Sequence, residues 1–247
     1  MFVDIPVPYL VASCLFAGAV LYTAVGHGGA SAYLAIQSLF GLPAGIMRPT
    51  ALTLNIIATA LTSGSFVRAG LFRWRTLWPF LLGSVPFAFV GGAISLPGAV
   101  YRPLVGVVLL ATALRLLWPR AFTANAKPRD PHVLVGVLFG AALGLLAGLT
   151  GTGGGIFLSP LLLFFGWSET RTASGVVAMF ILLNSLAGLA GNYAALGALP
   201  AELPLYAGAV AAGALVGSAA GIRLPQAALV KLLGVVLVIA GGKLILS

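Results

Sequence analysis

Charged side chains are scarce in this sequence. Lys, Arg, Asp and Glu make up only 7% of the 247 residues, whereas hydrophobic residues make up 60%. A water-soluble domain of this length could not cover its surface with so few charges. The composition therefore excludes an ordinary soluble protein and predicts a chain that spans a lipid bilayer.

The residue types that build most catalytic and metal sites are also rare. The chain has one cysteine, two histidines and four carboxylates, and the carboxylates, Asp4, Asp130, Glu169 and Glu202, stand in loops or near the ends of apolar runs. A single cysteine excludes an internal disulfide and a cysteine framework for a metal or cluster. An intramembrane enzyme would need a nucleophile with a base, or a set of metal ligands. We therefore expect no enzymatic activity and no bound cofactor, and the sequence assigns no metal ligands.

Stretches without a charged residue recur along the whole chain. They lie at 9–25, 50–67, 77–100, 103–114, 133–150, 172–199, 203–222 and 232–242. Several are long enough for a helix that crosses the bilayer core, which takes about 20 residues. We therefore expect an all-α polytopic membrane protein. The first residues carry Asp4 and no Lys or Arg, so we expect the first run to stay as a span and not to be removed as a secretory signal.

The formal net charge of +9 comes from basic residues that gather in two loops. These residues are Arg68, Arg73 and Arg75 in one loop, and Arg115, Arg120, Lys127 and Arg129 in or beside the other. Short loops rich in Lys and Arg are typical of the cytoplasmic side, so the charge does not indicate nucleic acid. We interpret 119–131 as a cytoplasmic basic linker between a first transmembrane repeat, 1–118, and a second, 132–247.

Each half contains one glycine-rich break in its apolar sequence. The second half has Gly151-Thr152-Gly153-Gly154-Gly155, and the first has Gly26-His27-Gly28-Gly29. A short apolar run follows each break and ends in Phe-Gly. Loop 68–75 is basic, whereas its counterpart 197–204 has no basic residue and contains Glu202. The equivalent loops are thus expected on opposite sides of the membrane, which favours two inverted repeats of about five helical segments each, with both termini outside.

Inversion with the linker inside requires an odd number of crossings in each half. We therefore expect the short runs 31–40 and 156–165 to count as crossings. The alternative is a parallel arrangement in which these runs are re-entrant and each half has four spans. About eleven residues of helix rise only some 16 Å, so the breaks should lie near the midplane. Irregular backbone is tolerated there only inside protein or beside a wet cavity.

The two breaks predict a central anion site. Helices that restart at Ala30 and Ile156 would direct free N–H groups and positive dipole ends inward. Inverted repeats, broken helices and a central site are typical of secondary transporters. The alternative interpretation is that these glycines only allow close helix packing. The candidate substrate-binding residues are Gly26, His27, Gly28, Gly29, Asn55, Gly151, Thr152, Gly153, Gly154, Gly155, Asn184, Arg48 and Arg171.

The candidates outside the breaks are polar groups that are costly at membrane depth. Asn55 and Asn184 have amide donors and acceptors to satisfy. Arg48 and Arg171 follow the two short runs at similar places; an arginine fork suits sulfonate oxygens, but positions near segment ends indicate snorkelling to the interface. His27 could handle protons near neutral pH. Coupling to Na⁺, coupling to H⁺ and facilitated export all stay open.

The residues around the second break carry a resemblance to a known family. The segment GLTGTGGGIFLSP at 148–160, LLLFFG at 161–166, TAS at 172–174 and NSLAG at 184–188 resemble the second half of the TauE/SafE sulfite exporter family, which includes 4-toluene sulfonate uptake permease-type transporters. The resemblance covers essentially the whole chain, strongly at 145–200 and more loosely at 20–75. The first copy departs from the pattern, because Ala30 replaces the last glycine and Ala35 stands where the second copy has Pro160.

The resemblance implies a secondary transporter, an exporter by the family name, for small sulfur-containing anions such as sulfite or organosulfonates. It implies alternating access in the inner membrane of bacteria. A passive anion channel and a carrier of another small organic anion stay as alternatives. The expected partners are the small anion and the lipid bilayer, with no nucleic acid. A homodimer is plausible for so small a transporter.

The inverted arrangement makes a testable prediction about loop positions. A reporter fused after Leu199 should read periplasmic and one fused after Lys127 cytoplasmic, because the loops differ in basic charge. Activity of paired reporters that report opposite compartments measures this directly. The same readout at both positions would favour the parallel arrangement with four spans per half.

Overall fold

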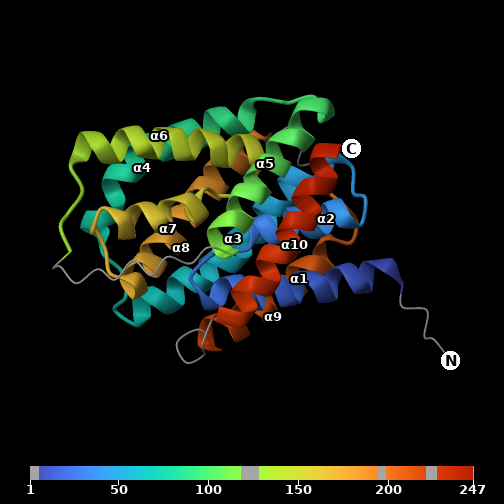
Figure 1. Ribbon diagram of the computed structural model, residues 1–247, viewed down its shortest axis with the longest axis horizontal. Coiled ribbons are helices and arrows are strands. Elements are labelled where there is room, and N and C mark those ends of the chain that lie inside the picture. The colour runs from blue at the N-terminus through green and yellow to red at the C-terminus, as the bar shows by residue number, and fades with distance from the viewer. Residues whose placement is uncertain (1–5, 118–127, 194–198, 221–226, 247) are drawn as a thin grey trace.

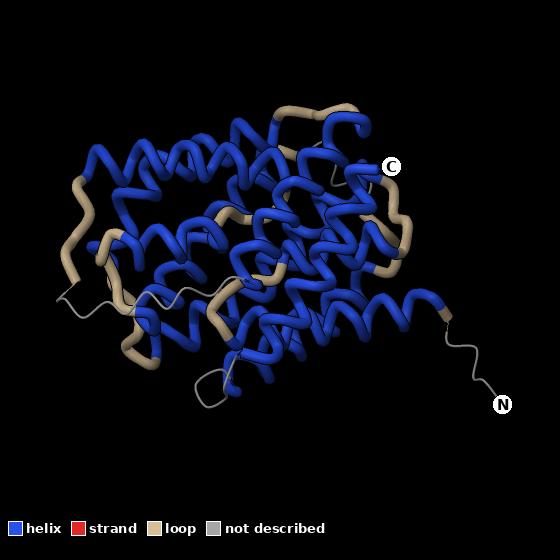
Figure 2. The backbone as a smooth tube through the Cα atoms, in the orientation of Figure 1, coloured by secondary structure: helices blue, strands red, loops and turns tan. Residues whose placement is uncertain are grey.

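A computed structural model describes residues 6–117, 128–193, 199–220 and 227–246, and its regular structure within them is entirely helical (Figures 1 and 2). The helices are α1 (Val7–Ala24), α2 (Ala30–Leu39), α3 (Ala44–Arg68), α4 (Trp74–Ala93), α5 (Gly98–Leu117), α6 (Val133–Thr150), α7 (Gly155–Phe164), α8 (Thr170–Gly191), α9 (Leu203–Ala220) and α10 (Ala227–Leu246). By length and composition, α1, α3, α4, α6, α8 and α9 can each cross a bilayer. The prediction of an all-α, multi-pass membrane protein is confirmed.

The helices run between two chemically different ends. At one end Arg73 Nη2 lies 3.1 Å from Asp130 Oδ1. The N–H of Arg129 donates to the carbonyl of Gly166 at 3.1 Å. The α3–α4 loop, the segment before α6 and the end of α7 therefore meet at one end, which we call the basic end. Residues 118–127 of the expected linker lie outside the described residues.

At the far end, opposite the basic end, Lys243 Nζ of α10 donates to the carbonyls of Ser38 at 2.8 Å and Leu39 at 3.1 Å, which end α2. Figure 1 shows the start of α1 and the end of α10 at this end, and the start of α6 at the other.

Each short helix folds back along the helix before it. A Cβ atom at Gly18 of α1 would lie 3.3 Å from Ala32 Cβ and 3.6 Å from Ile36 Cδ1 of α2. In the second half the rings of Phe139, on α6, and Phe165, which follows α7, have centroids 6.2 Å apart. Thus α1 and α2 form a hairpin that opens at the far end, and α6 and α7 form one that opens at the basic end (Figure 1).

Whether runs 31–40 and 156–165 cross the membrane stays a prediction, because two successive crossings would also return the chain to the end where it started. Helices α2 and α7 have ten residues each, which rise about 15 Å, and each leaves at the end where its hairpin began. A hairpin followed by three crossing helices still gives an odd number of crossings per half. Re-entrant segments are thus compatible with two halves that enter from opposite ends, and the orientation of those ends in a membrane stays a prediction.

The apolar packing leaves the two breaks in the middle of the molecule. One core joins α1, α2, α3, α5, α9 and α10 around the fully buried Tyr33. A second core joins α4, α7 and α8 around the fully buried Phe180. A small cluster of Tyr22, Ala32 and Ile156 connects them, and it brings the start of α2 against the start of α7.

Helices of one half pack against helices of the other. Helix α4 lies along α6, α1 along α9, and α5 along α10. The α4–α6 contact has glycines in place of side chains: a Cβ atom at Gly140 would overlap the carbonyl oxygen of Phe80, and one at Gly144 that of Ser84. Small residues four apart let two helix backbones touch, and the resulting van der Waals packing helps helices to associate in lipid.

This contact predicts opposite effects for two alanine substitutions. Gly144→Ala should lower the thermal unfolding temperature, because its Cβ overlaps backbone of α4, and overpacking costs about 1–3 kcal/mol. Gly208→Ala is the matched control, since Gly208 is also inside a helix and nothing lies within 4 Å of its Cβ position. It should leave the unfolding temperature unchanged or raise it, because alanine favours helix. Equal melting curves in detergent for both variants would contradict this account.

Candidate functional site

The start of each short helix is shaped by a glycine in the left-handed conformation. Gly29, before α2, has φ 99°, and Gly154, before α7, has φ 72°. Residues with a side chain rarely adopt these angles. Neither helix start has a side-chain cap. The glycines thus allow the chain to turn sharply and to begin a new helix in the protein interior.

The turns leave backbone donors without partners. Among the described residues, no hydrogen-bond acceptor faces the N–H groups of Gly28 to Ala32 in the first half, or those of Gly153 to Ile156 in the second. Free N–H groups at a helix start carry the positive end of the helix dipole. Because Ile156 packs against Ala32, both sets of donors lie in the same part of the interior.

Asn55 of α3 lies between the two breaks. A Cβ atom at Gly28 would overlap Asn55 Oδ1, and one at Gly153 would lie 2.6 Å from Asn55 Nδ2. Asn55 Nδ2 donates to Ser185 Oγ of α8 at 2.9 Å. Asn55 is fully buried, and its Oδ1 has no hydrogen-bond partner among the described residues. We call Gly28, Asn55, Gly153 and Ser185 the central cluster.

The remaining predicted residues of the breaks lie around this cluster. Gly26 and Gly151 are the tips of the hairpins; a Cβ atom at Gly26 would overlap Ser174 of α8, and one at Gly151 would lie 3.0 Å from Arg48 Cγ. Gly155 packs against Ile181. Thr152 Oγ1 lies 2.9 Å from Thr150 Oγ1.

His27 and Asn184 lie near the cluster but form local contacts. His27 is half-buried, and its Nδ1 is 3.1 Å from the carbonyl of Val25. Asn184 is fully buried, and its Nδ2 donates to the carbonyl of Phe180 in its own helix at 2.8 Å. Its Oδ1 has no partner among the described residues. That part of the chain also holds no group of three or more His, Cys, Asp and Glu residues that could bind a metal ion.

The two arginines that appear equivalent in sequence have different surroundings. Arg171 is exposed near the start of α8, at the basic end. Arg48 is only 7% exposed, so it does not snorkel to an interface. Its Nη1 donates to the carbonyl of Ile94 at 2.9 Å, and its Nη2 donates to the carbonyl of Gly92 and to Asn192 Oδ1 at 2.9 and 2.8 Å.

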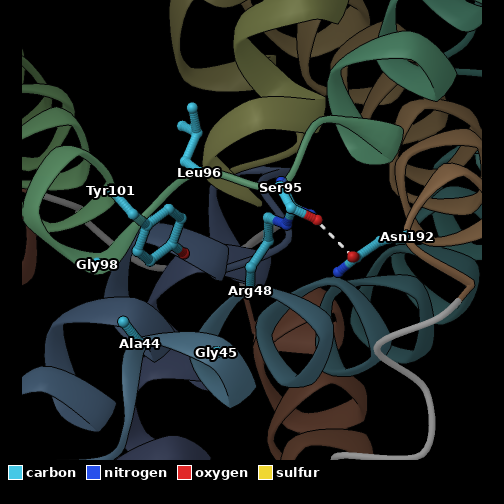
Figure 3. Close-up of a pocket in the computed structure, with 8 residues that line it drawn as sticks. All are labelled: Ala44, Gly45, Arg48, Ser95, Leu96, Gly98, Tyr101 and Asn192. Atoms are coloured by element: carbon cyan, nitrogen blue, oxygen red, sulfur yellow. Dashed lines mark hydrogen bonds between the residues drawn. The ribbon is translucent and has the colours of Figure 1, made fainter.

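Arg48 also lines a cavity of about 370 Å³ at the far end. The lining residues are Ala44, Gly45, Arg48, Ser95, Leu96, Gly98, Tyr101 and Asn192 (Figure 3). Tyr101 of α5 donates to the carbonyl of Thr150 at 3.1 Å, which ties the wall of the cavity to the tip of the second hairpin. Tyr101 was not among the candidate residues, because its separation from the break in sequence gives no sign of this contact.

Comparison with known proteins agrees with this architecture. The family described as "Sulfite exporter TauE/SafE" matches residues 10–244. The chain belongs to this family. A curated relative from Sinorhizobium fredii, named "Probable membrane transporter protein y4hK", is 35% identical over 239 residues, an alignment that covers 95% of this chain and 97% of the relative. No solved structure matches. The predicted family is confirmed, and the chain is a membrane transporter of the TauE/SafE type.

The central cluster predicts which glycine in this TauE/SafE transporter tolerates a methyl group. Gly153→Ala should reduce transport at least tenfold, because its Cβ would press on Asn55 and Ile181, whose Cγ2 lies 2.7 Å away, and disturb the break. Gly166→Ala is the control, since Gly166 has a similar φ of +65° but nothing within 4 Å. Both variants carry the same backbone strain of about 1 kcal/mol, so only the crowding differs. Equal transport rates at equal expression would show that the cluster is not sensitive to crowding.

Proposed function

We propose that this chain is a secondary carrier that moves small sulfur-containing anions, such as sulfite or organosulfonates, across the bacterial inner membrane by alternating access. The observation that carries the proposal is the meeting of two sets of free backbone N–H groups at the buried central cluster. Helix starts with free N–H groups bind anions through hydrogen bonds and the helix dipole.

The chemistry of the donors suits an oxyanion. A sulfite or sulfonate group offers three oxygens, each of which can accept more than one hydrogen bond. The donors from Gly28 to Ala32 and from Gly153 to Ile156 come from opposite sides of Asn55. Hydrogen bonds to a charged group contribute about 1.5–3 kcal/mol each. A few such bonds therefore hold a small anion without a permanently charged side chain at the centre.

The arrangement of the hairpins supports a carrier. One hairpin opens at the far end and the other at the basic end, and their inner turns share the central cluster. Movement of one hairpin against α3 and α8 would expose the cluster to one end at a time. Paired broken helices that meet at a midplane site are a common basis for alternating access. The basic end carries Arg68, Arg73 and Arg75, so we assign it to the cytoplasm.

The residues near the cluster limit how transport could be coupled to an ion gradient. The carboxylates Asp130, Glu169 and Glu202 stand at the ends of the helices, so a relay of protons through buried acids has no support. We propose coupling to Na⁺ or H⁺, with His27 as the titratable group for the latter.

A flux screen tests substrate and coupling together. Purified protein in proteoliposomes should take up sulfite, thiosulfate or a sulfonate in preference to carboxylates, with saturation and counterflow. The screen is run with and without a Na⁺ gradient and a pH gradient. Flux that does not saturate and shows no counterflow would indicate a channel. No flux of any of these anions would contradict the proposed function.

A substitution inside the cluster makes the mechanism specific. Asn55→Asp keeps the size of the side chain and places a carboxylate beside the free N–H groups, where it competes with the anion. We expect the KM for the transported anion to rise at least tenfold, which corresponds to about 1.4 kcal/mol. Thr62→Val is the control, because Thr62 is buried on the same helix but donates only to the carbonyl of Ala58, at 2.7 Å. A normal KM in Asn55→Asp would place the anion elsewhere.

A further inference from the structure

Arg48 is a buried positive charge with no acidic partner among the described residues. All of its hydrogen-bond acceptors are neutral: the carbonyls of Gly91, Gly92, Ile94 and Leu149, and Asn192 Oδ1. The ion pair that the described residues form, between Arg73 and Asp130, lies at the basic end of the molecule. The charge of Arg48 is therefore balanced only by dipoles, mainly those at the ends of α4, α6 and α8.

Burial of such a charge destabilises the folded protein unless an opposite charge or dipoles compensate it. Transfer of an unpaired ion into a protein interior has an effective penalty of several kcal/mol. Each helix end supplies only about half an elementary charge, shared among its carbonyls. The guanidinium has five N–H donors, and Nε has no recorded acceptor among the described residues. Arg48 thus keeps both charge and a donor available for an anion.

The cavity beside Arg48 has the size and chemistry to hold that anion. Its volume of about 370 Å³ exceeds that of a small oxyanion with a few waters. The cavity has polar side chains from four separate places, Arg48, Ser95, Tyr101 and Asn192, and no carboxylate lines it (Figure 3). It also lies directly beyond the tip of the second hairpin, since Gly151 packs on Arg48.

We propose that this cavity is an outer binding site for the transported oxyanion, where the anion rests beside Arg48 on its way to or from the central cluster. The proposal rests on the proposed function for the identity of the ligand. The corresponding place at the basic end differs, because the tip of the first hairpin, Gly26, packs on Ser174 and not on a cation. The site is therefore one-sided, and its effect on transport differs between the two ends.

The first test measures charge and binding in the cavity without transport. Ser95, which lines the cavity and is exposed, is replaced by cysteine in a Cys14→Ser background. An anionic methanethiosulfonate should modify this thiol about tenfold faster, relative to a cationic one, than it modifies Val7→Cys, a 60% exposed position at the same end; protein surface potentials of several kT give effects of this size. Methanesulfonate, a small sulfonate that does not react with the reagent, should protect the Ser95→Cys thiol in a saturable way.

Asn192→Asp makes the test specific to Arg48. It keeps an acceptor for Arg48 Nη2 and nearly the same volume, but it neutralises the charge. The preference for the anionic reagent and the protection by methanesulfonate should both fall about tenfold. Loss of neither would overturn the proposal. Arg48→Gln is a second variant that removes the charge itself and should behave alike.

The second test uses the asymmetry of the two ends. Asn192→Asp should raise the KM about tenfold for anion added from the far end, in intact cells, with kcat unchanged. It should have little effect on anion added from the basic end, in inside-out vesicles. Equal effects from both ends, or an effect on kcat alone, would show that Arg48 only holds the helix ends together and does not bind the anion. Protection by methanesulfonate in a protein that shows no flux would keep this anion site and reject the carrier function. Flux without protection would do the reverse.

Discussion

Backbone polar groups that cannot find partners in lipid determine how this molecule is built. Each glycine-rich break leaves at least four N–H groups without an acceptor among the described residues, and the bilayer core offers them none. The breaks must therefore be covered by protein. Helices α3 and α8 do this, with Asn55 and Ser185 joined across the middle. The close contact of α4 with α6 and of α1 with α9 then holds the cover in place.

The cover of each break comes from both halves of the chain. Asn55, on α3, touches the break of its own half at Gly28 and that of the other half at Gly153. Arg48, also on α3, packs on the tip of the second hairpin, and Ser174 of α8 packs on the tip of the first. Neither half alone would enclose its own break. The two halves of the chain therefore enclose one interior together.

The sequence alone predicted the all-α membrane class, the family and the position of the glycine-rich breaks, because these depend on composition and local pattern. It failed where the answer depends on tertiary contacts. Opposite loop charges require an odd number of crossings per half, which five crossings and a hairpin with three crossing helices satisfy equally. Arg48 and Arg171 have similar places in sequence, yet among the described residues only Arg48 donates to backbone carbonyls at the ends of α4 and α6 and to the side chain of Asn192 after α8. No local signal distinguishes them.

The central cluster offers neutral N–H donors, whereas the outer cavity offers the fixed charge of Arg48. This difference has a physical reason. A carrier must bind its anion firmly enough to select it and loosely enough to release it. Backbone N–H groups at the centre bind an anion without leaving a full unpaired charge in the interior once it has gone, which would cost several kcal/mol. A fixed charge is better placed beside a cavity at one end, where helix dipoles partly balance it when the anion has left and where it concentrates anions. Arg48 at the cavity and the N–H groups at the central cluster follow this order.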